Sequence, residues 1–450
     1  MPNKYEVFAI ALVVPLALGV ALSARQAPAD AALLAKAKAI HEKAITIDTH
    51  VDIGGADYAT AKLDPGGPTS RKCDLPKMKA GGLDGVFLAA YVGQRPDLTA
   101  TGFKPAYSQA IAGLEAINRL TKMHPELCDL GRSPADVERI AKTGKRAILV
   151  GVENGYPMGD DLANLKTFYD LGTRYMTLVH GSHNQLADSS GPAEPMHNGL
   201  SELGKRVVVE MNRLGMMVDL SHASAKSFWD AIATSKAPII ESHSGCKALS
   251  PNGRNLDDDQ LKALAKNGGV IQIVALAAYL KAEPPERTAA IQALRTELGM
   301  GGRGGGGAGA RGAAGAGGAA GAAGAAGQAR GGTPPAPLTP EQQADADKRR
   351  AAYQERLKEI DAKYPFQPAT LKDFVDHIDY AVKLAGIDHV GIGTDFDGGG
   401  GIPGFNDHSE ALNVTVELVK RGYTEQQIAK IWGGNLLRVW RDVEKATTRK

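Results

Sequence analysis

Eight short apolar runs recur along the chain, and each one ends in polar or glycine residues. The runs lie at 44–52, 83–92, 146–155, 175–180, 216–222, 237–244, 268–274 and 389–398. They are rich in Val, Ile and Leu without strict alternation, which is typical of parallel strands buried on both faces. Helical patterns lie between most of them, near 105–121, 134–143, 161–171, 200–214, 224–234, 258–267 and 370–385. Eight strand–helix repeats predict an α/β fold, the (β/α)8 TIM barrel; a doubly wound open sheet has the same alternation and is the alternative.

The interval between the seventh and eighth runs is far longer than one helix requires. It predicts an insertion at 281–365, in which helices near 285–298 and 341–362 flank a Gly/Ala-rich linker at 299–337. Glycine this dense loses much entropy on ordering, so we expect the linker to be disordered. The insertion leaves from the end of the barrel where active sites lie, so it is either a lid or, as we favour, a solvated segment without a catalytic role.

Three further helices are predicted after the eighth run. They lie near 408–421, 424–431 and 433–446. We expect them to pack around or under the barrel, which makes 30–450 a single domain.

The first residues resemble a targeting segment rather than part of the fold. Residues 7–24 are uncharged and mostly apolar, Lys4 precedes them, and small residues follow at 27–29. We therefore interpret 1–29 as a signal peptide, with a retained membrane anchor at 7–24 as the alternative. The protein is expected to be exported, to the periplasm or the cell exterior.

Charge and cysteine content exclude two classes of protein. Lys and Arg number 52 and Asp and Glu number 50, a net charge of +2 that argues against a general nucleic-acid binder. The three cysteines, Cys73, Cys128 and Cys246, cannot form a disulfide scaffold and lack the spacing of a structural zinc site.

Metal-binding side chains gather where the predicted strands end. They are His50, Asp52, Glu153, His180, His222, His243 and Asp395, with Asp397 two residues further on. The carboxyl ends of the strands of a barrel form one ring, so these residues from six strands are expected to converge. His, Asp and Glu together suit Zn²⁺ or a similar divalent ion. There are enough groups for two ions, with Glu153 placed to bridge them.

Six stretches of the chain carry a resemblance to a known family. They are IDTHVDI, VGVENGYP, YMTLVHGSHNQLADSS, VDLSHAS, PIIESHSGCKALSPNGRNLDDDQL and HVGIGTDFDG. In this order they are similar to the membrane (renal) dipeptidase family of the metal-dependent amidohydrolase superfamily. The resemblance implies a (β/α)8 barrel that hydrolyses dipeptides at two Zn²⁺ ions, and it favours a homodimer.

The resemblance also implies a role for each site residue. His50 and Asp52 would bind the first zinc, His222 and His243 the second, and Glu153 together with a hydroxide would bridge both. His180 would hold the substrate carbonyl oxygen, Arg254 would bind the terminal carboxylate, and Asp395 would transfer the proton. Asp395 is preferred to Asp397 because it directly ends the apolar run.

Three departures from the family pattern leave the ligand set intact. Val51 stands where Asn is frequent, Asp257 where Pro is frequent, and 274–276 lack the usual polar and aromatic residues. They bear on which substrate side chains fit, and the sequence does not determine these or the L/D stereochemistry.

Two other functions remain open at this stage. A related amidohydrolase could act on another carboxylate-bearing amide or lactam, such as an N-acyl amino acid or a β-lactam, because Arg254 selects for a carboxylate and not for a dipeptide. A non-catalytic metal-binding protein is the remote alternative, and it would require the loss of a catalytic residue that this chain retains.

Overall fold

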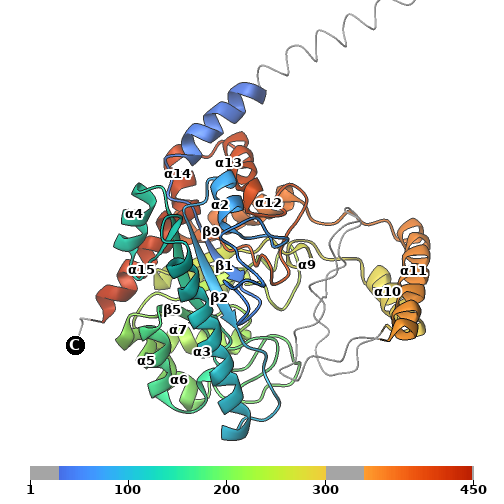
Figure 1. Ribbon diagram of the computed structural model, residues 1–450, viewed down its shortest axis with the longest axis horizontal. Helices are drawn as coiled ribbons and strands as arrows, with labels where there is room; N and C mark the ends of the chain where they lie inside the picture. Colours follow the sequence, from blue (N-terminus) through green and yellow to red (C-terminus); the bar gives the residue numbers. More distant parts are fainter. Residues whose placement is uncertain (1–29, 301–338, 448–450) are drawn as a thin grey trace, which may run out of the picture.

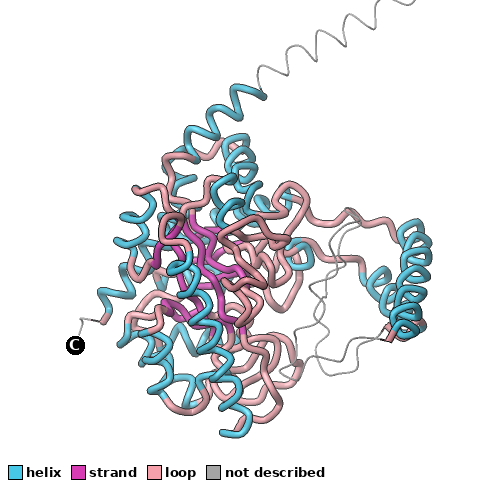
Figure 2. The backbone as a smooth tube through the Cα atoms, in the orientation of Figure 1, coloured by secondary structure: helices cyan, strands magenta, loops and turns pink. Residues whose placement is uncertain are grey.

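The computed structural model describes residues 30–300 and 339–447, which form a parallel barrel with helices around it (Figures 1 and 2). Its strands are β1 (Ile47–Asp52), β2 (Gly85–Tyr91), β4 (Arg146–Glu153), β5 (Thr173–Thr177), β6 (Met217–Asp219), β7 (Ile240–Ser244), β8 (Val270–Ile273) and β9 (Val390–Ile392). They are hydrogen-bonded in this order, and every pair is parallel. Each of the eight predicted strands is therefore present.

Residues just beyond β9 bring the last strand back to the first. The Asp395 N–H donates to the His50 carbonyl oxygen at 3.0 Å, and the Asp52 N–H donates to the Phe396 carbonyl oxygen at 3.0 Å. Val51 and Phe396 pair as a parallel bridge. Because these bonds join the two edges of the sheet, the (β/α)8 prediction is confirmed and the doubly wound open sheet is wrong.

The helices also follow the predicted pattern closely. They are α2 (Leu75–Gly81), α3 (Ala100–Met123), α4 (Pro134–Lys142), α5 (Leu162–Asp170), α6 (Glu202–Leu214), α7 (Ala225–Thr234), α8 (Asp258–Asn267), α9 (Ala277–Leu280), α10 (Pro285–Glu297), α11 (Pro340–Lys363), α12 (Leu371–Ala385), α13 (Ala411–Lys420), α14 (Glu425–Ala429) and α15 (Asn435–Ala446). Ser133, Ser201 and Ser224 cap α4, α6 and α7, each accepting a backbone N–H of the first turn. Asp257, one of the departures from the family pattern, caps α8 in a capping box with Gln260.

The elements that the sequence did not predict include α2, α9 and a strand β3 (Cys128–Leu130) that pairs with β4. The start of α3 was also placed too late, at 105 instead of Ala100. Pro105 lies inside this helix, near its beginning, where the missing N–H removes only one backbone hydrogen bond. Short elements and helix starts carry too few residues to show a periodicity.

The floor of the barrel is a column of aromatic side chains. Phe87 lies between Tyr175, at 5.1 Å between ring centroids, and Trp440, at 5.7 Å. All three are buried and belong to a cluster that joins the barrel interior to α15. The prediction that a C-terminal helix packs under the barrel is therefore confirmed for α15, which closes the end opposite to the site.

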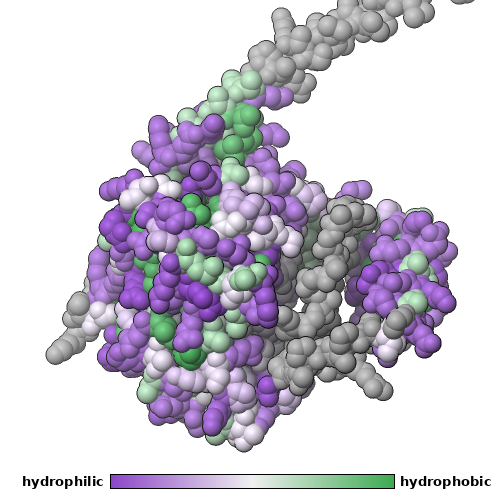
Figure 3. Space-filling model, in the orientation of Figure 1, coloured by the Kyte–Doolittle hydropathy of each residue, from purple (hydrophilic) through white to green (hydrophobic). Residues whose placement is uncertain are grey.

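The insertion between β8 and β9 contains a helical hairpin, α10 and α11, that stands away from the barrel (Figure 1). Ile291, Leu294 and Tyr353 form its small core, and its outer surface is largely hydrophilic (Figure 3). Arg287 at its base pairs with Glu283 at 2.7 Å and Asp361 at 2.6 Å. The predicted disordered linker at 299–337 lies, apart from its first two residues, outside the described residues.

The N-terminal segment 1–29 also lies outside the described residues, so the signal-peptide prediction is not tested. A helix spans 30–41 immediately after it. Across the two described ranges, no helix combines the length and apolar character needed to cross a bilayer.

Candidate active site

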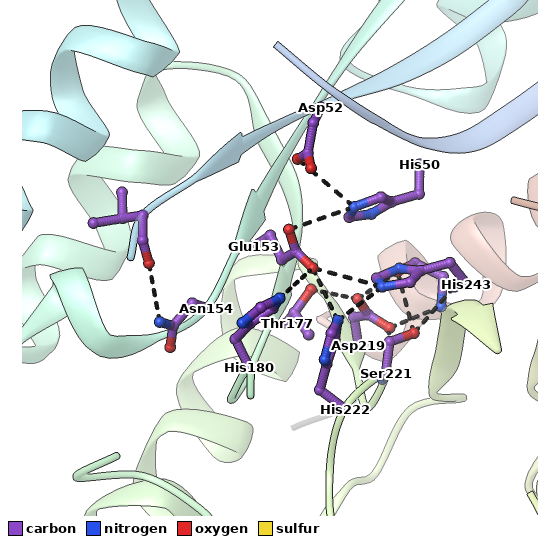
Figure 4. A network of polar contacts seen from close by, with 12 residues as sticks. His50, Asp52, Glu153, Asn154, Thr177, His180, Asp219, Ser221, His222 and His243 are labelled. Atoms are coloured by element: carbon purple, nitrogen blue, oxygen red, sulfur yellow. Dashed lines mark hydrogen bonds and ion pairs between the residues drawn. The ribbon is translucent and has the colours of Figure 1, made fainter. Parts of the chain in front are cut away.

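The predicted site residues converge at the carboxyl ends of the strands. Figure 4 shows His50, Asp52, Glu153, His180, His222 and His243 of this set. His50 and Asp52 lie on β1, Glu153 is the last residue of β4, and His243 lies on β7. The other three follow their strands at the same distance: His180, His222 and Asp395 each lie three residues beyond the end of β5, β6 and β9. The common position explains why separate strands deliver their side chains to one place.

The backbone turns sharply at several of these strand ends. Asn154, His222, Asp395 and Asp397 have φ values of 81°, 72°, 58° and 65°. Residues other than glycine rarely adopt this left-handed conformation, and where they do, functional sites are common. Local hydrogen bonds stabilise this conformation. At Asn154, for example, the side-chain amide donates to the Val92 carbonyl oxygen at 3.0 Å.

Glu153 lies at the centre of the cluster, with its two oxygens facing different partners. Its Oε1 lies 3.0 Å from His222 Nε2, 3.5 Å from His243 Nε2 and 3.6 Å from His180 Nε2. Its Oε2 lies 3.6 Å from His50 Nε2. A carboxylate that faces two groups of ligands from its two oxygens has the arrangement of a bridging ligand.

The donor atoms fit bound divalent cations. His50 Nε2 and Asp52 Oδ1 are buried without a hydrogen-bond partner, although they lie 4.0 Å apart. His222 Nε2 and His243 Nε2 face each other at 2.9 Å. Three overlapping groups have ligand atoms within 4.8 Å of one another: His50, Glu153 and His243; Glu153, His180 and His222; His50, Asp52 and Asp395. A cation would satisfy the two unpartnered atoms of His50 and Asp52.

Electrostatics favour the same conclusion. Burial lowers the pKa of His222 and of His243 well below the usual value, with Arg254 as a further cause, so both imidazoles are neutral, the form that binds metal. Burial would raise the pKa of Glu153, but His50 and the other imidazoles outweigh it and hold that pKa well below its usual range. Against the opposing effect of burial, Glu153 raises the pKa of His50 to about 10. The pocket therefore attracts positive charge.

Asp397, the alternative acid/base residue, faces away from this cluster. Its carboxylate accepts the backbone N–H groups of Lys72, at 2.9 Å, and Cys73, at 3.2 Å. It also pairs with Arg71 at 3.3 Å. These bonds hold the loop before α2 and engage both oxygens of Asp397 with partners outside the cluster.

Asp395, in contrast, belongs to the cluster with His50 and Asp52. Burial raises its pKa to about 7, with His50 acting in the opposite direction and Glu153 raising it further. A carboxyl group with this pKa exchanges a proton near neutral pH, as general acid–base catalysis requires. The geometry thus separates two aspartates that are equivalent in the sequence pattern.

Arg254 reaches the site from the loop after β7. Its Nη2 donates to the His243 carbonyl oxygen at 3.0 Å, while its Nε is buried without a hydrogen-bond partner. The guanidinium lies 5.3 Å from the ring centroid of Tyr279. Burial raises the pKa of Tyr279, and Arg254 opposes this rise. An arginine with unused donors can bind a carboxylate with two parallel hydrogen bonds.

Sequence reasoning missed two aromatic residues at the site. Tyr279 on α9 was missed because the stretch after β8 begins with apolar residues. Tyr91, the last residue of β2, lies 4.8 Å from His180 between ring centroids. Tyr91 could have been found from the sequence, because it lies at the end of a predicted strand, as the candidate metal ligands do. The side chain of His180 is 31% exposed, which leaves it open to a substrate.

The remaining seven histidines have structural partners. Their ring nitrogens contact Thr415 and Gly81 (His41), Asp64 (His124), Glu194 (His183), Asn184 (His197), Leu280 (His377), Gly269 (His389) and Asp48 (His408). His183 lies only three residues after His180, but its Nδ1 accepts the Ser189 backbone N–H at 2.9 Å, so its partners belong to the following loop.

His50 is held from below by two buried residues. Its Nδ1 lies 2.8 Å from the Tyr175 hydroxyl, which directs Nε2 toward Glu153. Asp48 accepts the His50 backbone N–H at 3.1 Å and the Thr394 N–H at 2.9 Å. The aromatic column of the barrel floor and the seam between β1 and β9 therefore both end at this imidazole.

Comparison with known proteins agrees with the geometry. The profile of the family described as membrane dipeptidase, peptidase family M19, matches residues 34–450. The crystal structure of the probable dipeptidase PvdM from Pseudomonas aeruginosa is 33% identical, with a TM-score of 0.73 over 92% of this chain and 99% of that one. Dipeptidase tcpJ from Claviceps purpurea is 28% identical over 376 residues, 82% of this chain and 69% of the relative.

A more distant structure shares the fold. It is a metallo peptidase from Rhodobacter sphaeroides bound to a phosphinate mimic of the dipeptide L-Ala-D-Ala. The two chains are 21% identical with a TM-score of 0.64, over 88% of this chain and 99% of that one.

Proposed function

Because the chain belongs to the membrane dipeptidase family, peptidase family M19, and is therefore a metal-dependent peptide-bond hydrolase, we propose that it is an exported dipeptidase with two zinc ions. The observation that carries the proposal is the placement of Glu153, whose two oxygens face separate groups of ligands. A single-ion site would need only one of these two groups of ligands.

The metal ligands would divide between the two sides of Glu153. His50 and Asp52 would hold one ion, His222 and His243 the other, and Glu153 both. Zinc bound there supplies two kinds of chemistry, since it brings the pKa of a water molecule near neutrality and polarises a carbonyl group.

The other site residues bind the substrate and move its protons. Arg254, with Tyr279 beside it, would bind the terminal carboxylate of a dipeptide. His180 would donate a hydrogen bond to the carbonyl oxygen of the bond to be cleaved and stabilise the charge that develops there. Asp395 would accept the proton of the attacking water and give it to the leaving amine.

A related amidohydrolase activity on another carboxylate-bearing amide or lactam is the second candidate. Arg254 supports it equally, because a guanidinium recognises the carboxylate and not the remainder of the molecule. A non-catalytic protein is disfavoured, since Asp395 lies in the cluster with a pKa suited to proton transfer.

The test of the proposed function is a kinetic survey of the purified protein with its metal content measured on the same sample. We expect dipeptides to be cleaved, with about two zinc ions per chain, and chelation to abolish turnover until zinc is restored. The panel should contain L- and D-residues at the second position, N-acyl amino acids and a β-lactam. If these other amides were cleaved much faster than every dipeptide, the second candidate would replace the first.

Replacing Arg254 is expected to weaken substrate binding more than turnover. In Arg254→Ala we expect KM for dipeptides to rise roughly 10- to 100-fold, because hydrogen bonds to a charged group contribute about 1.5–3 kcal/mol each. A dipeptide with an amidated C-terminus should be insensitive to the change. Arg213→Ala, at an exposed position on α6, is the matched control. Equal losses for the free acid and the amide would contradict the carboxylate role.

Two further features of the proposal rest on the sequence and the resemblance alone. They are export directed by 1–29, to the periplasm or the cell exterior, and assembly into a homodimer. N-terminal sequencing of the secreted protein and its mass in solution are the measurements that decide them.

A further inference from the structure

A buried carboxylate beneath the metal ligands has no role in the proposed mechanism. Asp219, the last residue of β6, is fully buried inside the barrel. Its Oδ1 accepts the backbone N–H groups of Ser221, at 3.1 Å, and Ser242, at 2.8 Å. Its Oδ2 accepts the hydroxyls of Ser242, at 2.6 Å, and Thr177, at 2.5 Å. Four donors face its two oxygens, so the carboxylate acts only as an acceptor.

The contact with Ser242 continues to a metal ligand. Ser242 Oγ lies 2.9 Å from Nδ1 of His243, whose Nε2 lies among the other ligand atoms of the cluster (Figure 4). Since the Ser242 hydroxyl donates its hydrogen to Asp219, its oxygen is left to accept one from His243. The imidazole then carries its proton on Nδ1 and presents the lone pair of Nε2 to the site.

We propose that Asp219 is a positioning residue that sets the tautomer of His243 through Ser242. The inference rests on the proposed metal site, because the tautomer matters only if Nε2 binds a cation. Partners of this kind orient metal-binding histidines and commonly change metal affinity when they are replaced. Here a serine hydroxyl transmits the effect from the carboxylate to the ring.

The neighbouring Ser221 is consistent with this direction of donation. Its Oγ accepts the His243 backbone N–H at 3.0 Å and lies 3.3 Å from Ser242 Oγ. Ser221 can therefore donate to Ser242, whose shorter contact, at 2.6 Å, is the one to Asp219. Asp219 is therefore a better acceptor for the hydroxyl hydrogen of Ser242 than Ser221 is.

The variant Asp219→Asn reverses this polarity with almost no change in shape. Two backbone N–H groups face the position of Oδ1, so the amide oxygen must take that place, and the NH2 group must face Ser242 and Thr177. Ser242 then accepts from the amide and directs its own hydrogen to His243 Nδ1. The proton of the imidazole moves to Nε2, where it competes with the metal ion.

The test measures zinc affinity by competition with a chromogenic chelator, independently of activity. We compare the affinity of the more weakly bound of the two zinc ions. In Asp219→Asn we expect this affinity to be roughly 10- to 100-fold lower than in the unaltered protein. Ser242→Ala removes the hydroxyl that links Asp219 to His243 and places no donor against Nδ1. Its zinc affinity should therefore fall less than that of Asp219→Asn. The double variant should bind zinc more tightly than Asp219→Asn alone, because the misdirected hydroxyl is gone.

The double variant distinguishes tautomer control from a merely structural role. If Asp219 only joined β6 to β7, the double variant would bind zinc no more tightly than Asp219→Asn, and that result would overturn the inference. An unchanged zinc affinity in Asp219→Asn would overturn it as well. Thermal melting of the metal-free variants separates loss of the fold from loss of affinity. Failure of the unaltered protein to bind two zinc ions would instead count against the proposed function.

Discussion

Glu153→Ala is expected to abolish both metal retention and catalysis. Both carboxylate oxygens face ligands, so the substitution removes a donor from each side of the site at once. We expect kcat/KM for dipeptides to fall by roughly 10³-fold or more, beyond the loss of a single charge-stabilising group. Zinc content should fall from about two ions per chain to one or fewer after dialysis.

The appropriate controls separate the bridge from the general effect of removing an acid. Glu153→Gln keeps the shape but offers only one oxygen, so it should retain one ion more readily than the alanine variant. Glu355→Ala, at an exposed position on α11, should leave metal content and turnover unchanged. Turnover by Glu153→Ala at the level of the unaltered protein would show that the two-ion mechanism is wrong.

Asp395→Asn is expected to retain zinc but to lose proton transfer. The amide keeps the shape of the carboxylate and cannot accept a proton, so kcat should fall by roughly 10²- to 10⁴-fold. Asp397→Asn is the matched comparison, because its side chain binds the backbone of Lys72 and Cys73 instead of the cluster. It should lose stability more than catalytic rate.

The pH dependence gives a second measurement on the same residue. Burial raises the pKa of Asp395 to about 7, so the carboxyl is increasingly protonated, and unable to accept a proton, as pH falls below that value. Bound cations would lower this pKa, which places the acid-side decline of kcat/KM at or below about pH 7. The decline should be absent from the residual activity of Asp395→Asn. An unchanged profile in that variant would assign the titration to another group.

The convergence of the candidate ligands could be predicted because the carboxyl ends of all strands of a barrel lie on one ring. His222 and Glu153 are 69 residues apart, yet both lie at the carboxyl end of a strand and their side chains meet at 3.0 Å. A polar residue that interrupts an apolar run at its end is conspicuous in the sequence. The regular alternation of strands and helices then predicts the barrel that brings these residues together.

The choice between Asp395 and Asp397 could not be derived from alternation along a strand. Residues two apart on a strand point the same way, but β9 ends at Ile392 and both aspartates lie in a turn at positive φ. Their directions depend on the seam with β1, a contact between opposite ends of the chain. The sequence favoured Asp395 because it directly ends the apolar run. In the structure the two aspartates differ because Asp395 lies in the cluster, whereas Asp397 binds the backbone of Lys72 and Cys73.

Residues that act from beneath the site were also invisible in the sequence. Asp219 and Tyr175 each lie within an apolar run, where one polar or aromatic residue has no distinct pattern. Tyr279 follows β8 on a single helical turn that sequence periodicity cannot reveal. Their roles depend on which side chain lies next to them, which is a property of packing and not of spacing.

The order of the proposed site residues along the chain separates the two tasks of the site. The proposed metal ligands are complete at His243, whereas Asp395 and the seam that holds it emerge more than a hundred residues later, after the α10–α11 hairpin. The proposed metal ligands and the proposed proton carrier therefore belong to separate stretches of the chain, with the α10–α11 hairpin between them. A variation in the hairpin's length would leave each of the two groups intact within its own stretch.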